Sequence, residues 1–188
     1  MFSAQKDTLE DEAFVSFGHV WKKATQGCAR GFYNHPEKEC TCPPGAVQKY
    51  LNRVSGPLLD RIDLHVEVTP VAFSELSDQN MGEPSASIRE RVIRAREIQA
   101  ERYKEQEGVY ANAQMSSKLL REVCIINIAG ENLLRKAMEK LNLSARAYDR
   151  ILKVSRTIAD LAASEDIKPE HLAEAIHYRS LDREGWAG

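Results

Sequence analysis

The sequence has few cysteines, no long apolar run and almost no net charge, and each shortage excludes a class of protein. Four cysteines in 188 residues are too few for a disulfide scaffold. No apolar run approaches the roughly 18 residues that cross a bilayer, and the first residues lack the pattern of a secretory signal. The 26 Lys and Arg nearly balance the 28 Asp and Glu. We therefore expect a cytoplasmic protein without membrane contact, in which any binding of a polyanion is local.

The sequence also lacks the short motifs of an autonomous active site. Its ten glycines are dispersed, and none belongs to a G-x-x-x-x-G-K-[ST] phosphate loop or a G-x-G-x-x-G turn. The five histidines form no H-E-x-x-H pattern, and no serine stands in G-x-S-x-G. The chain therefore carries no recognisable nucleotide cradle of its own.

Composition divides the chain into an atypical N-terminal segment, residues 1–27, a loop-rich part, residues 28–84, and a helical part, residues 85–188. The loop-rich part predicts a short helix from Ala46 to Val54. It then alternates polar and apolar residues over eight positions, which predicts a strand with its apolar side chains on one face: Ile62, Leu64, Val66 and Val68.

The helical part predicts a bundle of about five helices, so the fold class is mainly α. The first helix opens on the capping-box pattern Ser87–Glu90, with Ile88, Val92 and Ala95 facing inward. The others are expected over residues 116–123, 131–140, 145–162 with Ser144 as N-cap, and from Pro169 onward. A bundle alone implies no activity.

Two arginines stand out by position. Arg61 opens the predicted strand just after a turn, and Arg146 lies in the first turn of a predicted helix. From the residues alone, Arg61 between Asp60 and Asp63 reads as a surface ion pair. Arg146 is expected to be a solvated side chain. A cation in the first turn of a helix interacts slightly unfavourably with the helix dipole, which favours a functional role for this arginine.

Several long, collinear motifs resemble one known family. They are Gly31–Gly45, Tyr50–Val66, Asn112–Met115, Leu143–Leu161 and Pro169–Arg183. Together they are similar to the C-terminal part of the magnesium-chelatase-like AAA+ ATPases of the ComM/YifB type, over about residues 28 to 183. The resemblance implies that residues 28–84 are a remnant of the α/β AAA+ core, with a short strand and a cysteine loop. Residues 85–188 would form the α-helical lid.

The resemblance also implies roles for the two arginines. Arg61 would be the arginine finger, which acts in trans on ATP held by the neighbouring subunit, and Arg146 would be the second-sensor arginine that contacts an ATP phosphate. The resemblance implies that the complete family protein uses ATP and Mg²⁺ and forms a cytoplasmic, homo-oligomeric ring, a hexamer in the family. That ring would couple hydrolysis to DNA remodelling, as a helicase does in branch migration during recombination or competence. This chain, without a phosphate loop, should not hydrolyse ATP alone.

Other functions stay open at this point. The bundle could be an interaction module that joins or regulates rings of a full-length homologue, or part of a chelatase-like ATPase subunit. A third hypothesis is a small zinc-loop binder of nucleic acid. The helix over residues 87–107 carries five arginines interleaved with glutamates, a pattern that favours a solvated helix with i,i+4 ion pairs over a DNA-binding surface.

The cysteine loop suggests a metal site. The family usually shows a Cys-x-Cys pair on each side of the Gly-Phe-Tyr segment, and here the second pair is intact as Cys40 and Cys42 while the first retains only Cys28. His35 could supply the missing ligand of a tetrahedral zinc site. Cys124 stands among apolar residues and is expected to be a packed core thiol.

Overall fold

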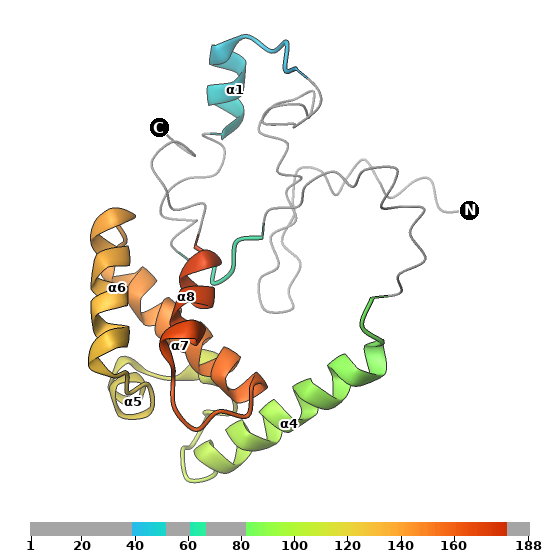
Figure 1. The fold of residues 1–188 in the computed structure, drawn as a ribbon, viewed down its shortest axis with the longest axis vertical. Helices are drawn as coiled ribbons and strands as arrows, with labels where there is room; N and C mark the ends of the chain where they lie inside the picture. Colours follow the sequence, from blue (N-terminus) through green and yellow to red (C-terminus); the bar gives the residue numbers. More distant parts are fainter. Residues whose placement is uncertain (1–38, 52–60, 67–81, 180–188) are drawn as a thin grey trace. The chain divides into compact units, whose positions relative to one another are not determined.

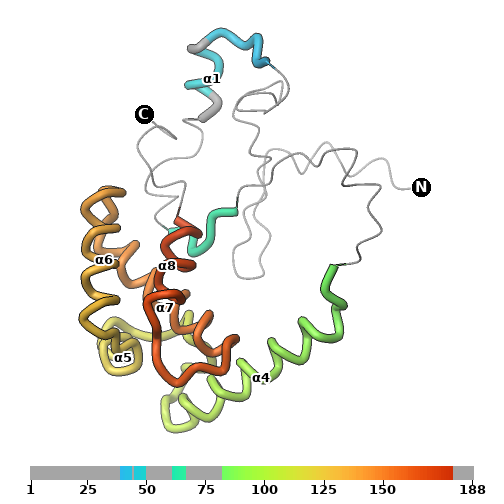
Figure 2. Tube along the Cα trace, viewed as in Figure 1, coloured from blue at the N-terminus to red at the C-terminus, as the bar shows by residue number. Residues whose placement is uncertain are grey.

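The computed structural model describes residues 39–51, 61–66 and 82–179, drawn in colour in Figures 1 and 2. The chain forms two compact units, and the larger one comprises residues 63–65 and 71–184. Within the described residues every regular element is helical, which confirms the mainly α class. The predicted segment 1–27 lies outside the described residues.

Helix α1 (Pro44–Leu51) belongs to the smaller unit and matches the short helix expected after the cysteine pair. It begins at Pro44, because proline needs no hydrogen bond for its missing N–H in a first turn and its φ already suits a helix. Val47 is buried and packs against Cys40 and Cys42. The last three residues of the predicted helix, 52–54, lie outside the described residues.

The predicted strand over residues 61–68 is wrong for its described part, because residues 61–66 form a turn and an irregular extended segment. Leu64 and Val66 are 49% and 60% exposed, whereas His65 between them is 5% exposed. An alternating apolar face forms a strand only where a neighbouring strand supplies a ladder of backbone hydrogen bonds. Here the His65 amide donates a single backbone hydrogen bond, 2.7 Å long, to the carbonyl of Tyr178.

Helix α4 (Ser85–Tyr103) begins two residues before the predicted capping box. Pro84 occupies the N-cap position and no side chain caps the helix, so the predicted box at Ser87 is wrong. The second half of α4 packs on the bundle, through Ala95, Gln99 and Tyr103. Ile88 and Val92, expected inside, are 41% and 45% exposed because the first half of α4 extends away from the other helices (Figure 1).

The ion pairs of α4 also differ from the predicted i,i+4 pattern. Among the described residues, Arg91 donates two hydrogen bonds to Glu83 ahead of the helix, at 2.8 and 3.0 Å. Lys104 pairs with Glu101 at i,i+3 spacing. Arg102 reaches a carboxylate far away in the sequence. Arg91 and Arg102 therefore pair with carboxylates outside α4, which the spacing within the helix does not encode.

The remaining helices follow the sequence closely, because their start signals are local. Ser116, Asn127 and Ser144 each accept a hydrogen bond from a backbone N–H of the first turn and so begin a helix. The bounds are α5 (Ser117–Val123), α6 (Ile128–Lys140), α7 (Ala145–Leu161) and α8 (Pro169–His177). A short 3₁₀ turn, η1 (Asn112–Gln114), precedes α5. With α4 they make the five-helix bundle that was predicted.

Helix α7 is the centre of the bundle. It packs against α4, η1, α5 and α8, while α6 packs against α8. The buried side chains come from every one of these segments: Tyr103, Met115, Leu120, Cys124, Leu134, Ile151, Leu152, Ala159, Ile167, Leu172 and Ala175. Cys124 is a core thiol as predicted; burial raises its pKa to about 12. Its Sγ lies 3.7 Å from the Leu152 carbonyl oxygen, which accepts its weak hydrogen bond.

The loops before α6 and α8 are joined by a parallel β-bridge between Ile126 and Ile167. Each helix begins within two residues of this bridge, so the two helices start side by side. Gly130, in the first turn of α6, is buried at the contact, and a Cβ there would lie 2.7 Å from Cδ1 of Leu172 in α8.

We therefore expect Gly130→Ala to lower the free energy of unfolding by about 1–3 kcal/mol, because the added methyl overpacks this contact. Chemical denaturation followed by circular dichroism measures the change. Ala129→Gly, at the exposed neighbouring position in the same turn, is the control for the backbone effect. A Gly130→Ala variant as stable as the wild type would contradict the tight α6–α8 contact.

Within the described residues, no helix combines the length and apolarity needed to cross a membrane.

Candidate functional site

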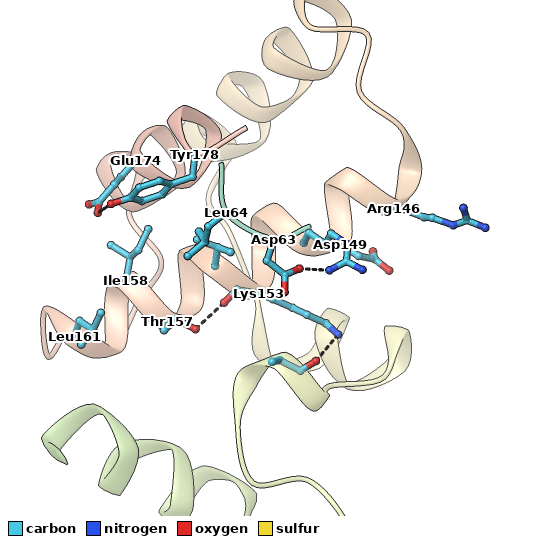
Figure 3. A pocket seen from close by; sticks show the side chains of 13 residues that line it. Asp63, Leu64, Arg146, Asp149, Lys153, Thr157, Ile158, Leu161, Glu174 and Tyr178 are labelled. Atoms are coloured by element: carbon cyan, nitrogen blue, oxygen red, sulfur yellow. Dashed lines mark hydrogen bonds and ion pairs between the residues drawn. The ribbon is translucent and has the colours of Figure 1, made fainter. Parts of the chain in front are cut away.

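A groove of about 550 Å³ runs along α7 in the larger unit (Figure 3). Its floor is the exposed side of α7, and its walls come from the segment around Asp63, from η1 and from α8. The residues that line it are Asp63, Leu64, Ala113, Arg146, Asp149, Arg150, Lys153, Val154, Thr157, Ile158, Leu161, Glu174 and Tyr178. Most of the charged residues lie at one end, whereas Ile158, Leu161 and Tyr178 lie at the other end together with Glu174 (Figure 3).

The charged end is a basic stripe formed by Arg146, Arg150 and Lys153. Their i, i+4 and i+7 spacing places them on one face of α7. The Lys153 Nζ donates a 2.9 Å hydrogen bond to the Ala113 carbonyl, and Arg150 forms an ion pair with Asp63. Two of the three cations are thus committed to protein groups, whereas Arg146 is exposed and points away from them at the end of the groove (Figure 3).

The start of α7 favours an anion. The Ser144 Oγ accepts a 3.2 Å hydrogen bond from the Ala147 amide, which fixes the first turn that carries Arg146. No acidic residue lies in that turn, so the positive end of the helix dipole and the guanidinium add to one another. Asp63 and Asp149 also line the groove, so the groups that favour an anion are Arg146 and the start of α7 rather than the groove as a whole.

Arg61 lies in the smaller unit, in a turn, with its side chain exposed. It is accessible to a group outside the chain, which a finger acting on a neighbour requires.

The predicted metal ligands are only partly described. Cys40 and Cys42 are half-buried and pack against Val47 of α1. Within the described residues, no group of three or more histidine, cysteine or acidic side chains is arranged to hold a metal ion. Cys28 and His35 lie outside the described residues, so the zinc site stays a prediction.

Sequence reasoning missed a buried polar network around Asp160, near the end of α7. The Asp160 carboxylate accepts hydrogen bonds from Arg102 at 2.6 and 2.8 Å, from the Asn112 Nδ2 at 2.8 Å and from the Arg156 Nε at 3.1 Å. The Tyr103 hydroxyl donates to the Asn112 Oδ1 at 2.7 Å. The network therefore ties α4 and η1 to α7, which holds the basic stripe.

The network shifts the pKa of its members. Burial alone raises the pKa of Asp160, but hydrogen bonds from Arg102 and Asn112 and the charges of Arg102 and Arg156 outweigh it, so the pKa is lowered. The pKa of Arg102 is raised, above all by its hydrogen bonds to Asp160. Asp160 and Arg102 are therefore both ionised at neutral pH, and the charge of the buried carboxylate is compensated.

Two local signals point to this network in retrospect. Arg156 and Asp160 stand at i,i+4 spacing, and Asp160 directly follows Ala159, a fully buried position of α7. A charge at the margin of an apolar helix face needs a partner. The partner Arg102, 58 residues away in the sequence, is not encoded by any local pattern.

Comparison with known proteins places the chain in a family. The family described as "Magnesium chelatase, subunit ChlI C-terminal" matches residues 82–179, and "Magnesium chelatase, subunit ChlI" matches residues 18–76. The second match begins before Cys28, where the resemblance noted above begins, and so covers part of the segment 1–27.

Three curated relatives are similar over most of the chain. The competence protein ComM of Haemophilus influenzae is 47% identical over 141 residues, which are 74% of this chain and 27% of the relative. The YifB proteins of Salmonella typhimurium and Escherichia coli are 38% and 40% identical over 154 residues, 81% of this chain and 29% of each relative. The chain thus spans less than a third of the length of these relatives. It belongs to the magnesium-chelatase-like family that includes ComM and YifB.

Proposed function

We propose that this chain supplies the arginine-bearing end of an AAA+ core and the helical lid of a ring-forming ATPase. Residues 28–84 would be the end of the core and residues 85–188 the lid. The complete protein would couple ATP hydrolysis to DNA remodelling, such as branch migration. The name of the Haemophilus relative, a competence protein, supports a role in DNA uptake or recombination. ATP and Mg²⁺ would be held by a phosphate loop outside this chain.

The observation that carries the proposal is the placement of Arg146. Its exposed guanidinium extends from the capped first turn of α7, at the charged end of the groove, with no acidic residue in that turn. Guanidinium stays charged and can donate two parallel hydrogen bonds to phosphate oxygens. A second-sensor arginine needs this arrangement, because it must reach a nucleotide bound to another part of the protein. In the assembled ring, Arg61 would reach the nucleotide of the neighbouring subunit.

A chimera tests the role of Arg146. This chain replaces the matching segment of the Haemophilus ComM protein, which supplies the rest of the sequence. The isolated chain is expected to show no ATP turnover, and the chimera to hydrolyse ATP with Mg²⁺. Arg146→Ala in the chimera should lower kcat/KM for ATP by about 10- to 100-fold, the effect of one lost hydrogen bond between charged groups.

Arg135→Ala is the matched control, because Arg135 is exposed on α6 and does not line the groove. A phosphate release assay measures turnover, and circular dichroism confirms that each variant is folded. Unchanged kinetics of Arg146→Ala in an active chimera would rule out the second-sensor role. Robust hydrolysis by the isolated chain, abolished by Arg61→Ala, would contradict the division of the site between this chain and the rest of the protein.

A further inference from the structure

The segment Asp63–His65, which follows Arg61 in the chain, lies against the lid helices. Asp63 forms an ion pair with Arg150 of α7, and Leu64 lines the groove along the same helix. The His65 amide donates its 2.7 Å hydrogen bond to the Tyr178 carbonyl, just after α8, and the His65 side chain is buried. Asp63 and His65 thus contact α7 and the residue after α8 by an ion pair and a backbone hydrogen bond, and Leu64 between them lines the groove.

This short segment stands between the two arginines of the proposed mechanism. Asp63 is two residues after Arg61, so their Cα atoms lie at most about 7 Å apart. Arg150 is four residues after Arg146 on α7, a rise of about 6 Å along a rigid helix. The ion pair between Asp63 and Arg150 therefore links a residue near Arg61 in the chain to the helix that carries Arg146.

We propose that Asp63–His65 is a clip that fixes the arginine-finger segment to α7, with Asp63 as the residue that positions Arg61 through Arg150. The inference rests on the proposed function for the roles of Arg61 and Arg146. A change in the position of α7, caused by a nucleotide at Arg146, would then move Arg61 at the next site of the ring. Asp63 itself would contact no nucleotide and would act only by holding Arg61 in position.

The clip itself is tested on the full chain, without ATP. Hydrogen–deuterium exchange of the peptide that covers residues 61–66 reports the His65 amide. Asp63→Arg and Arg150→Asp should each raise the exchange rate of that amide by about two- to fivefold, the range of a partly exposed ion pair. The double variant with both changes restores the pair with its charges exchanged, and should return the rate close to that of the wild type.

Asp166→Asn is the control, because Asp166 is an exposed acidic residue in the loop before α8, outside the groove. It should leave exchange at residues 61–66 unchanged. A wild-type exchange rate at residues 61–66 in both single variants would show that the clip is wrong, independently of any ATPase activity of the ring.

Kinetics of the chimera test the positioning role. Asp63→Asn should lower kcat by about two- to fivefold with little change in KM, because a finger contributes in the transition state rather than in ATP binding. The charge-exchanged double variant should recover kcat. A residue with a merely structural role would change the melting temperature or the active fraction and would not show this recovery.

The outcomes separate the two proposals. If Arg61→Ala and Arg146→Ala lower ATP turnover as predicted while Asp63→Asn and Asp63→Arg leave kcat at the wild-type value, the clip is wrong and the proposed function stands. If Arg61→Ala and Arg146→Ala turn over ATP like the wild type, the proposed function fails, and the positioning role fails with it. A loss of kcat in both single clip variants with recovery in the double variant supports both proposals.

Discussion

Asp160→Ala is expected to lower the free energy of unfolding of the chain by about 3–5 kcal/mol, because it leaves buried cations without their carboxylate. The Asp160 side chain is fully buried, and the Arg156 side chain is 4% exposed. Removing the carboxylate also takes a hydrogen-bond acceptor from Asn112 Nδ2. A loss of this size is a large fraction of the total stability of an ordinary domain. Urea denaturation followed by circular dichroism measures it.

Asp149→Ala is the matched control for this prediction. Asp149 is an aspartate of the same helix, and its carboxylate accepts a single 3.2 Å hydrogen bond, from the Ser117 hydroxyl at an exposed position. Its loss should change the free energy of unfolding by no more than about 0.5–1 kcal/mol. Equal effects of Asp160→Ala and Asp149→Ala would show that the network does not hold α4 to α7.

The same carboxylate gives the stability a defined dependence on pH. The folded-state pKa of Asp160 lies below its ordinary value of 3.8, so the unfolded chain takes up the proton first as the pH falls. The stabilisation is complete above the unfolded pKa and is lost as the pH falls through the folded pKa. The stability difference between the wild type and Asp160→Asn should therefore be constant near neutral pH and shrink in acid, below about pH 4.

Arg61→Ala is expected to have the largest effect on activity. In the chimera described above, it should lower kcat by about 10³- to 10⁵-fold, the range found for arginine fingers in phosphoryl transfer. KM for ATP should change much less, because the finger offsets charge that develops in the transition state. Steady-state phosphate release at several ATP concentrations measures both constants.

Arg94→Ala serves as the control, since Arg94 is an exposed arginine of α4 and lies outside the groove. Its kcat should stay within twofold of the wild type. Gel filtration with ATP shows whether the Arg61→Ala chimera still assembles, which separates a lost finger from a lost ring. A variant that assembles and retains wild-type kcat would remove Arg61 from the mechanism.

The helices that the sequence predicts well are those with a local start signal. The hydroxyls of Ser144 and Ser116 cap α7 and α5, because serine directly before a helical repeat of apolar residues favours an N-cap. Pro169 is the first residue of α8. These signals act between residues three or four positions apart, so they can be recognised from the local sequence alone. Cys124 is likewise placed in the core by its apolar neighbours.

The errors arise where distant segments decide the structure. Ile88 and Val92 repeat at helical spacing, but no described segment covers the first half of α4, and they stay exposed. The alternation from Ile62 to Val66 resembles a strand, yet residues 61–66 form no strand, and the His65 amide instead donates to the Tyr178 carbonyl after α8.

The groove was only partly predictable for the same reason. Arg146 was a candidate because of its place in a first turn and the motif around it. Arg150 and Lys153 follow on the same helix face, but their partners Asp63 and Ala113 come from other segments, 87 and 40 residues away in the sequence. Asp160 is paired across a comparable separation. Contacts of this range depend on the fold as a whole, which local spacing does not contain.

We propose that this chain supplies Arg146 and Arg61 to ATP sites whose phosphate loops come from other parts of the ring. Arg146 would serve the site of its own subunit, and Arg61 would serve the site of the neighbouring subunit. A mixed-ring assay tests it most directly. One partner is the Arg61→Ala chimera, which keeps the phosphate loop and lacks the finger; the other is a chimera with the phosphate-loop lysine replaced, which keeps Arg61 and cannot use ATP. Each should be inactive alone, and their mixture should hydrolyse ATP, because a finger on one subunit serves the phosphate loop of the next. A mixture as inactive as its two components, under conditions where the rings exchange subunits, would contradict the claim.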